Sequence, residues 1–273
     1  MSTINVNNIL PDSGSMVNLN GINVAANGIT SFQFTTSNIL RPATNSIIIG
    51  PSAGASLLSG SYNNVIIGYS SGNNTQNGYS NVFIGTATGG NNQNGALNTF
   101  IGSQAGQQST QDGNTFIGWN AGSNASTTTN STCIGANAQP SAGNAFSEFT
   151  LGNANVLTLR CAATTITAVS DERDKKDIKV LPVGLEFVKT LKPVEFVWDD
   201  RDEDGKHDIK DFGFIAQDLK KSQEDAGLAD TLKLVYESNP DKLEASYGKL
   251  VPILVKAIQD LTAKVEELEN KLK

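Results

Sequence analysis

Two residues five positions apart, Ser170 and Lys175, are the ones in this chain whose types and spacing fit covalent chemistry. A serine hydroxyl is a weak nucleophile until a base removes its proton. A lysine amine acts as that base only in its neutral form, which burial in an interface or nearby cations such as Arg173 and Lys176 favour. One turn of chain would bring the two side chains together. We therefore predict that Ser170 is a nucleophile and that Lys175 is its general base.

Such a serine would break one of its own two peptide bonds. Attack on the preceding carbonyl passes through a five-membered ring and cleaves Val169-Ser170, whereas attack from a neighbouring chain would cleave Ser170-Asp171. We expect Asp171 to orient the lysine or to cap a helix. The structural alternative is that this segment only starts a helix, with Ser170 as N-cap and acidic residues in the first turn.

The same serine marks a change of composition. The chain has 20 basic and 27 acidic residues and a net charge of -7, with no basic stripe, so we expect no nucleic-acid partner. No apolar run approaches membrane-spanning length and the start lacks a signal-peptide pattern, so we expect a soluble protein without membrane insertion. We also expect no cofactor. Only five charged residues precede Ser170, namely Asp12, Arg41, Asp112, Glu148 and Arg160.

The chain before Ser170 contains a short repeat. A fixed short period indicates stacked β-structure, with alternate strand residues pointing inward, glycine at corners and asparagine in hydrogen-bonded ladders. Asparagine stands three residues before the isoleucine in most repeats, at Asn64, Asn81, Asn98 and Asn114, and Ser46 and Ser131 replace it in others. The repeated pairs, spaced 16 to 18 residues apart, are Ile49-Gly50, Ile67-Gly68, Ile84-Gly85, Ile101-Gly102, Ile117-Gly118, Ile134-Gly135 and Leu151-Gly152.

This repeat resembles the head repeats of trimeric bacterial adhesins, which carry Asn-x-x-Ile-Gly rungs of their own. The resemblance implies a trimeric β-roll or β-prism for the stalk, residues 45–169. A single-chain β-solenoid with the same rungs is the alternative. Residues 1–44 are expected to form short strands and resemble the leaders of phage structural proteins, which attach a fibre to the particle.

After Ser170 the pattern is that of a small α+β domain, residues 170–273. We expect a helix over 181–191, a strand over 193–198, a strand turning into a helix over 212–219, a short strand over 234–236 and a long helix from Tyr247. The ordered motifs are SDxRxKxxI at 170–178, LKPVEFVW at 191–198, GFIAQDL at 213–219 and YGKLVPILVKAIQDL at 247–261.

These four motifs resemble the C-terminal intramolecular chaperone domain of phage tailspikes and tail fibres, of the endosialidase type. The resemblance implies that the domain forms a homotrimer, templates folding of the β stalk and then cleaves itself at Ser170. The function expected from it is that of a tail-fibre-like structural protein of a virion, with other virion components and a host surface receptor as partners. A trimeric adhesin of a microbial cell surface, matured in the same way, is the alternative. Self-cleavage is the one enzymatic activity expected.

The long C-terminal helix carries a heptad pattern that predicts a coiled coil over 247–272. β-branched residues at the first core position with leucine at the second favour two strands, whereas the resemblance implies three. The alternative is a helix that packs only on its own domain. The first core position holds Val251, Ile258, Val265 and Leu272, and the second holds Tyr247, Leu254, Leu261 and Leu268.

Two further features are weighed as sites. The acidic residues Asp200, Asp202 and Asp204 have the spacing of a calcium loop, but the sequence lacks the final glutamate and its flanks resemble strands. We expect a solvated hairpin loop without a metal, with His207 exposed in it. Cys133 and Cys161 are expected to be buried small apolar residues and not a disulfide pair.

Overall fold

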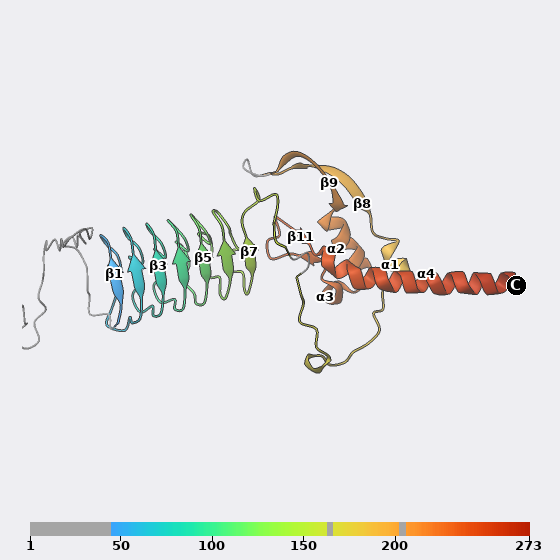
Figure 1. Cartoon of the computed structure of the whole chain (residues 1–273), viewed down its shortest axis with the longest axis horizontal. Helices are drawn as coiled ribbons and strands as arrows, with labels where there is room; N and C mark the ends of the chain where they lie inside the picture. Colours follow the sequence, from blue (N-terminus) through green and yellow to red (C-terminus); the bar gives the residue numbers. More distant parts are fainter. Residues whose placement is uncertain (1–44, 163–165, 202–205) are drawn as a thin grey trace, which may run out of the picture. The chain divides into compact units, whose positions relative to one another are not determined.

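The computed structural model of the chain describes residues 45–162, 166–201 and 206–273 (Figure 1). These residues divide into two compact units, with the boundary between Leu151 and Gly152. The leader segment expected over residues 1–44 lies outside the described residues.

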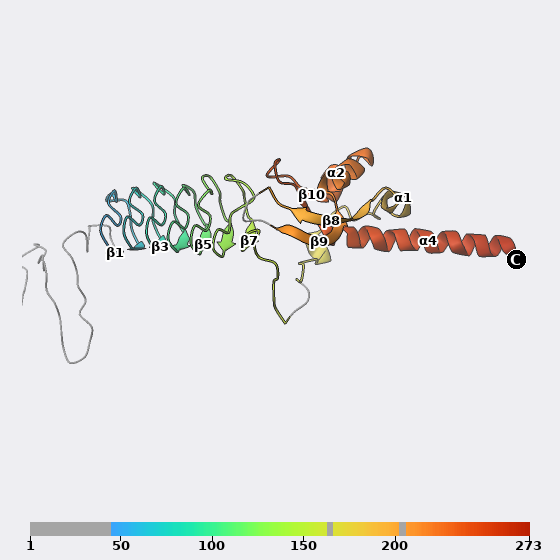
Figure 2. The same ribbon diagram turned by 90° about the horizontal axis from the view of Figure 1, so that it is seen from above.

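The first unit is a parallel β-solenoid with one three-residue strand in each turn. Each strand pairs with the next one in the sequence, in parallel and in the register of the repeat, so that Phe83 pairs with Phe100 and Phe100 with Phe116. Figure 2 shows the successive turns as a regular coil. The turns of one chain therefore pair with one another, as the solenoid alternative expected. The strands are β1 (Ile47–Ile49), β2 (Val65–Ile67), β3 (Val82–Ile84), β4 (Thr99–Ile101), β5 (Thr115–Ile117), β6 (Thr132–Ile134) and β7 (Phe149–Leu151).

The middle residue of the strands fills the inside of the solenoid. The aromatic rings stack in line, with centroids 5.1 Å apart for Phe83 and Phe100 and 5.0 Å apart for Phe100 and Phe116. Because aromatic pairs at this separation add to the free energy of burial, the column stabilises one turn on the next. The buried members are Ile48, Ile66, Phe83, Phe100, Phe116 and Cys133.

Cys133 continues this column, and its burial raises the pKa of the thiol to about 11. The prediction that Cys133 is a buried apolar residue is therefore confirmed. The same prediction for Cys161 is wrong, because Cys161 is exposed in the segment that follows the last strand. Both thiols are free, so the two cysteines form no disulfide.

A ladder of buried asparagines forms a second column inside the solenoid. The Asn98 side chain accepts a hydrogen bond from the backbone N–H of Asn114 at 2.9 Å and donates to the Gln111 carbonyl at 2.8 Å. Where serine replaces asparagine, the hydroxyl takes over the acceptor role, as Ser131 does for the N–H of Glu148 at 3.1 Å. The predicted asparagine ladder is confirmed. The side chains that accept in this way from the next ladder residue are Asn64, Asn81, Asn98 and Asn114.

We expect Asn98→Ala to lower the free energy of unfolding of the solenoid by roughly 3 kcal/mol, because it leaves a buried donor and a buried acceptor unpaired. Asn98→Ser is the matched control, since serine keeps an acceptor as Ser131 does, and it should cost about half as much. Thermal unfolding followed by the β-sheet signal in circular dichroism measures both. Equal losses from the two variants would contradict this account of the ladder.

Glycine occupies the corner after each of the first six strands. Gly102 has a φ of +129°, and a Cβ built on it would lie 2.4 Å from the carbonyl oxygen of Gly118 in the next turn. Only a residue without a side chain allows both this conformation and this approach. The predicted role of the Ile-Gly pair at a corner is thereby confirmed.

The strand ladder ends at Leu151, earlier than the limit at residue 169 expected for the stalk. The described residues between this strand and Ser170, which are 152–162 and 166–169, form no helix or strand. Most of these residues are exposed. Ser170 therefore follows an extended segment and not a strand of the solenoid.

The second unit is the expected α+β domain. The first strand of its hairpin, helix α2 and the long helix α4 correspond to predicted elements. Helix α1 is much shorter than the helix expected over 181–191, and the short helix α3 was not predicted. Its elements are η1 (Glu172–Asp174), α1 (Leu185–Val188), the antiparallel pair β8 (Pro193–Asp199) and β9 (His207–Phe214), α2 (Ala216–Asp225), α3 (Ala229–Leu232), the antiparallel pair β10 (Val235–Tyr236) and β11 (Glu244–Ala245), η2 (Tyr247–Lys249) and α4 (Leu250–Leu272).

Helix α4 uses one face to close the core of this domain. Ile253 is buried against α1, and the carboxylate of Asp260 accepts a hydrogen bond from the backbone N–H of Leu185 at 3.1 Å. The heptad residues on α4 remain exposed in the single chain. Among the helices in the described ranges, none has the length and apolar character needed to span a membrane. The exposed heptad residues of α4 are Val251, Leu254, Ile258, Leu261, Val265, Leu268 and Leu272.

Tyr247 differs from the other heptad residues. It precedes α4 and its hydroxyl accepts a hydrogen bond from the backbone N–H of Phe214 at 3.0 Å. A Cβ on Gly213 would lie 2.4 Å from this hydroxyl, so a larger residue there would displace the Tyr247 side chain. Tyr247 thus ties the end of β9 to the start of the long helix.

Candidate functional site

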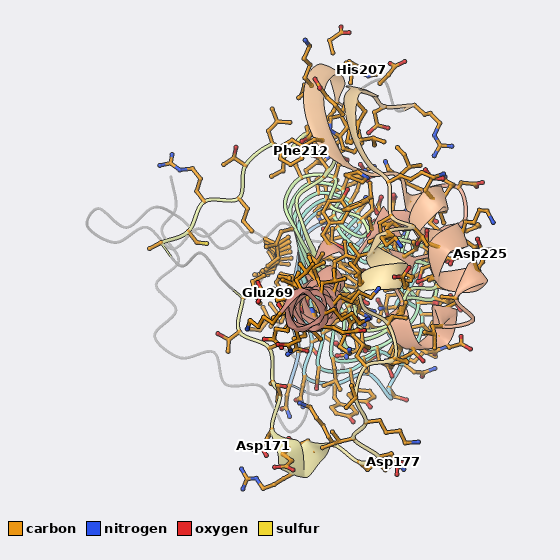
Figure 3. The ribbon with its side chains drawn as sticks, turned by 90° about the vertical axis from the view of Figure 1, so that its right-hand side faces the viewer. Asp171, Asp177, His207, Phe212, Asp225 and Glu269 are labelled. Carbon is orange, nitrogen blue, oxygen red and sulfur yellow. The ribbon has the colours of Figure 1, made fainter. Side chains whose placement is uncertain are left out.

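A short turn organises the chain around Ser170. The 3-10 helix η1 is capped by Asp171, whose carboxylate accepts a hydrogen bond from the backbone N–H of Arg173 at 2.9 Å. The backbone N–H of Lys175 donates to the carbonyl of Glu172 at 3.0 Å and closes the turn. Figure 3 shows Asp171 and Asp177 at the two ends of this segment. The segment does start a helical turn, but its N-cap is Asp171 and not Ser170.

This turn returns the side chain of Lys175 to Ser170. The amine nitrogen Nζ lies 2.5 Å from the serine Oγ and 3.0 Å from the serine carbonyl oxygen. The structure therefore brings together the two residues that the sequence pattern paired. Contact of a hydroxyl with an amine at hydrogen-bonding distance is the geometry that proton transfer between them requires.

Solvent surrounds this pair in the single chain. Both Ser170 and Lys175 are exposed. Removal of a lysine amine from water favours its neutral form, which is the form that can accept a proton. In the described single chain, the geometry for general-base chemistry is present without the dry surroundings that favour it.

Asp171 is engaged by Arg173 and not by the lysine. The guanidinium contacts both carboxylate oxygens, through Nε at 3.0 Å and through Nη2 at 2.6 Å. Arg173 thereby lowers the pKa of Asp171, and the carboxylate in turn raises the pKa of Arg173. Because the pair is solvent-exposed, it adds little to stability and serves to hold the turn. The sequence pattern did not reveal this partnership.

The acidic loop between β8 and β9 lies at the tip of a hairpin, as expected. Asp202 and Asp204 are outside the described residues. Asp200 donates its backbone N–H to the carbonyl of Lys206 at 2.9 Å, and Nδ1 of His207 lies 3.1 Å from a carboxylate oxygen of Asp199. His207 is exposed, as expected, but it is the first residue of β9 and not part of the loop (Figure 3). Within the described part of the chain, no three His, Cys, Asp or Glu side chains lie close enough together to hold a metal ion.

Fold and site together define a parallel β-solenoid followed by a small α+β domain that opens with a serine–lysine pair. Residues 170–228 match the family model of peptidase S74, described as the chaperone of endosialidase. The chain therefore carries a C-terminal intramolecular chaperone domain of this type, and the match begins at Ser170. It ends before η2 and α4, so it is shorter than the resemblance seen over the sequence motifs. Comparisons of the chain with curated proteins and with solved structures gave no significant match.

Proposed function

We propose that residues 170–273 assemble three copies of the chain, template the folding of their solenoids and then release themselves by cleavage at Ser170. The observation that carries this proposal is the contact of Lys175 with Ser170, at the first residue of the matched chaperone region. The pair lies beyond the last strand, so cleavage there leaves the solenoid whole.

The chemistry needs one nucleophile, one base and water. With Lys175 taking the hydroxyl proton, Oγ of Ser170 attacks the carbonyl carbon of Val169. The bond from this carbon to the Ser170 nitrogen breaks, an ester forms, and the nitrogen leaves as an amine with the proton that Lys175 held. Water then hydrolyses the ester to a Val169 carboxylate and restores the hydroxyl. Cleavage of Ser170-Asp171 by a neighbouring chain is the second route, and the contact of Lys175 with the Ser170 carbonyl supports it by polarising that carbonyl.

Assembly would switch this chemistry on. A base of this kind needs a neutral amine, and removal from water favours the neutral form of a lysine. Both partners are exposed in one chain, so a second or third chain must cover them. Cleavage would then wait until the copies have come together.

The exposed heptad stripe of α4 supports assembly through this helix. The helix has 23 residues and is about 34 Å long, and its own domain buries only the neighbouring face, which carries Leu250, Ile253 and Ala257. Burial of such a stripe between parallel helices is the usual basis of a coiled coil. We propose that α4 forms the first contact between chains.

We further propose that the protein is a tail-fibre-like component of a virion. A β-solenoid with a self-removing chaperone suits a long-lived shaft, with residues 1–44 joining it to other virion components and the solenoid surface meeting a host receptor. This proposal rests on the type of the C-terminal domain.

Production of the full chain beside residues 1–169 alone tests the proposal. We expect the full chain to yield a trimeric stalk by native mass spectrometry together with a released C-terminal fragment, and residues 1–169 alone to yield little trimer. The Ser170→Ala chain is the control that separates templating from cleavage, because it should form trimers and remain whole. A monomeric full chain, or an equal yield of trimer from residues 1–169 alone, would refute the proposed function.

A further inference from the structure

The outward side of the solenoid sheet carries an unbroken column of aliphatic side chains at the third strand position. The third residue of every strand points outward and is isoleucine, except for leucine in the last strand. We call the outward side of the strands the isoleucine face. Exposure is greatest at its two ends, with Ile47 at 54% and Leu151 at 48% of their full accessible area, and is 37% at Ile101 in the middle. The third-position residues are Ile49, Ile67, Ile84, Ile101, Ile117, Ile134 and Leu151, and the first-position residues are Ile47, Val65, Val82, Thr99, Thr115, Thr132 and Phe149.

The return segments of the same turns are different in character. Most exposed positions there carry amides and hydroxyls. Large apolar side chains such as Tyr69, Leu97 and Trp119 are also exposed, but none of their positions is apolar in every turn. An outward strand position needs only β-propensity, which threonine supplies as well as isoleucine does. Threonine does occur at the first position, yet no polar residue occurs at the third. The exposed return residues of two central turns include Asn91, Gln93, Asn94, Gln108 and Gln111.

The size of this face is that of an interaction surface. Six steps of about 4.8 Å make it about 29 Å long, and three residues make it about 10 Å wide. An exposed apolar surface on the order of 300 Å² is as large as the patches that mark contact sites on soluble proteins. It is smaller than the roughly 800 Å² per partner that a standard stable interface buries. Contact through this face therefore needs a second contact to bring its partner near.

Charge and spacing identify the partner. Between residues 45 and 151 the only charged side chains are Asp112 and Glu148, and neither belongs to a strand. A neutral face meets an identical face without like-charge repulsion. Its side chains also recur at the spacing of the strands, and a second copy of this chain has the same spacing.

We propose that copies of this chain pack against one another through their isoleucine faces. This inference rests on the proposed assembly of three chains, and the exposed stripe of α4 is the second contact that the small area requires. Every turn offers nearly the same side chains, so a shift by one strand spacing, about 4.8 Å, removes little contact. The isoleucine face holds the chains together but does not set their register, which is left to residues 170–273.

Cross-linking of single cysteines tests this arrangement in the full chain. The background is Cys161→Ser, because Cys133 is buried and its raised thiol pKa keeps it unreactive under native conditions. Ile101→Cys places a thiol on the isoleucine face, and Gln108→Cys places one on the return segment of the same turn as the matched control. After treatment with a short bismaleimide, we expect linked chains on denaturing gels from Ile101→Cys and loss of that product in Gln108→Cys.

Native mass spectrometry of the same samples distinguishes a failure of the isoleucine face as the contact from a failure of the proposed assembly. Trimers in which Ile101→Cys does not link, or in which Gln108→Cys links equally well, overturn the isoleucine face as the contact and leave the proposed function intact. Monomers in both samples overturn the proposed assembly and this inference with it. As a second measure, Ile84→Lys with Ile101→Lys should abolish the trimer of the cleaved stalk, whereas Gln93→Lys with Gln108→Lys should leave it in place, and equal behaviour of the two pairs refutes the inference.

Discussion

The Ser170→Ala chain is expected to remain a single polypeptide of 273 residues under conditions in which the unaltered chain is cut in two. Without the hydroxyl there is no nucleophile, and loss of a nucleophile lowers the rate of such reactions by at least about four orders of magnitude. Lys175→Met keeps the length of the side chain but removes the base, and we expect a loss on the order of a hundredfold or more. Denaturing gels over time, with intact mass spectrometry, give both rates.

Lys179→Met is the matched control, since it removes an exposed lysine that lies nine residues from the serine in the sequence and has no part in the proposed chemistry. It should cut at nearly the normal rate. The fragment masses also identify the bond, because cleavage at Val169-Ser170 and at Ser170-Asp171 places the serine on different fragments. Normal cleavage in both Ser170→Ala and Lys175→Met would show that the pair is not the catalytic unit.

The second large effect is expected from Gly102→Ala in the corner column. The added methyl group meets the Gly118 carbonyl at 2.4 Å, a distance that real Cβ atoms do not show, and the residue must also keep a φ of +129°. Strain and displacement of this kind cost roughly 3 kcal/mol or more. Because each turn is stacked on its neighbours, we expect the damage to spread and to lower sharply the yield of folded solenoid.

Ser103→Ala tests whether any substitution at this corner destabilises the solenoid as Gly102→Ala is expected to do. It is the next residue of the same turn and is not among the positions with positive φ. Its melting temperature should stay within a few degrees of the unaltered protein, consistent with the small effect of a surface substitution. An unchanged melting temperature in Gly102→Ala would contradict the close approach of the two corners.

The solenoid was predictable in detail because its repeat period is written directly in the sequence. Once Phe83 and Phe100 occupy the same place in successive turns, their pairing and their inward direction follow from the alternation of a strand. The asparagine ladder and the glycine corners follow in the same way. The direction of the chain within the sheet could be predicted without information on contacts between distant residues.

Features that depend on packing were less predictable. The helix expected over 181–191 is reduced to α1, and Val183 and Leu191 join the small core from outside the helix. The exposure of Cys161 depends on where the strand ladder stops, which the apolar pattern after Leu151 does not reveal. Composition alone assigns a lone cysteine to the interior.

The site was predictable in its central pair and not in its supporting residue. A spacing of five residues across one turn was enough to bring Lys175 to Ser170. Asp171 had two cations within reach, and the nearer one in sequence, Arg173, binds it from both its backbone and its side chain. A planar guanidinium fits both carboxylate oxygens, and an amine does not, which is why Arg173 is preferred.

The near absence of charge in the solenoid has a consequence for endurance. The carboxylate of Asp112 accepts a hydrogen bond from the backbone N–H of Ala96, and that of Glu148 accepts one from the backbone N–H of Ser141, both at 2.8 Å. Salt screens interactions between charges, so the stability of the solenoid should change little with ionic strength. The C-terminal domain has many surface ion pairs, so its stability should depend on ionic strength. A solenoid held together by amide ladders and stacked rings should therefore unfold at nearly the same temperature at low and at high ionic strength.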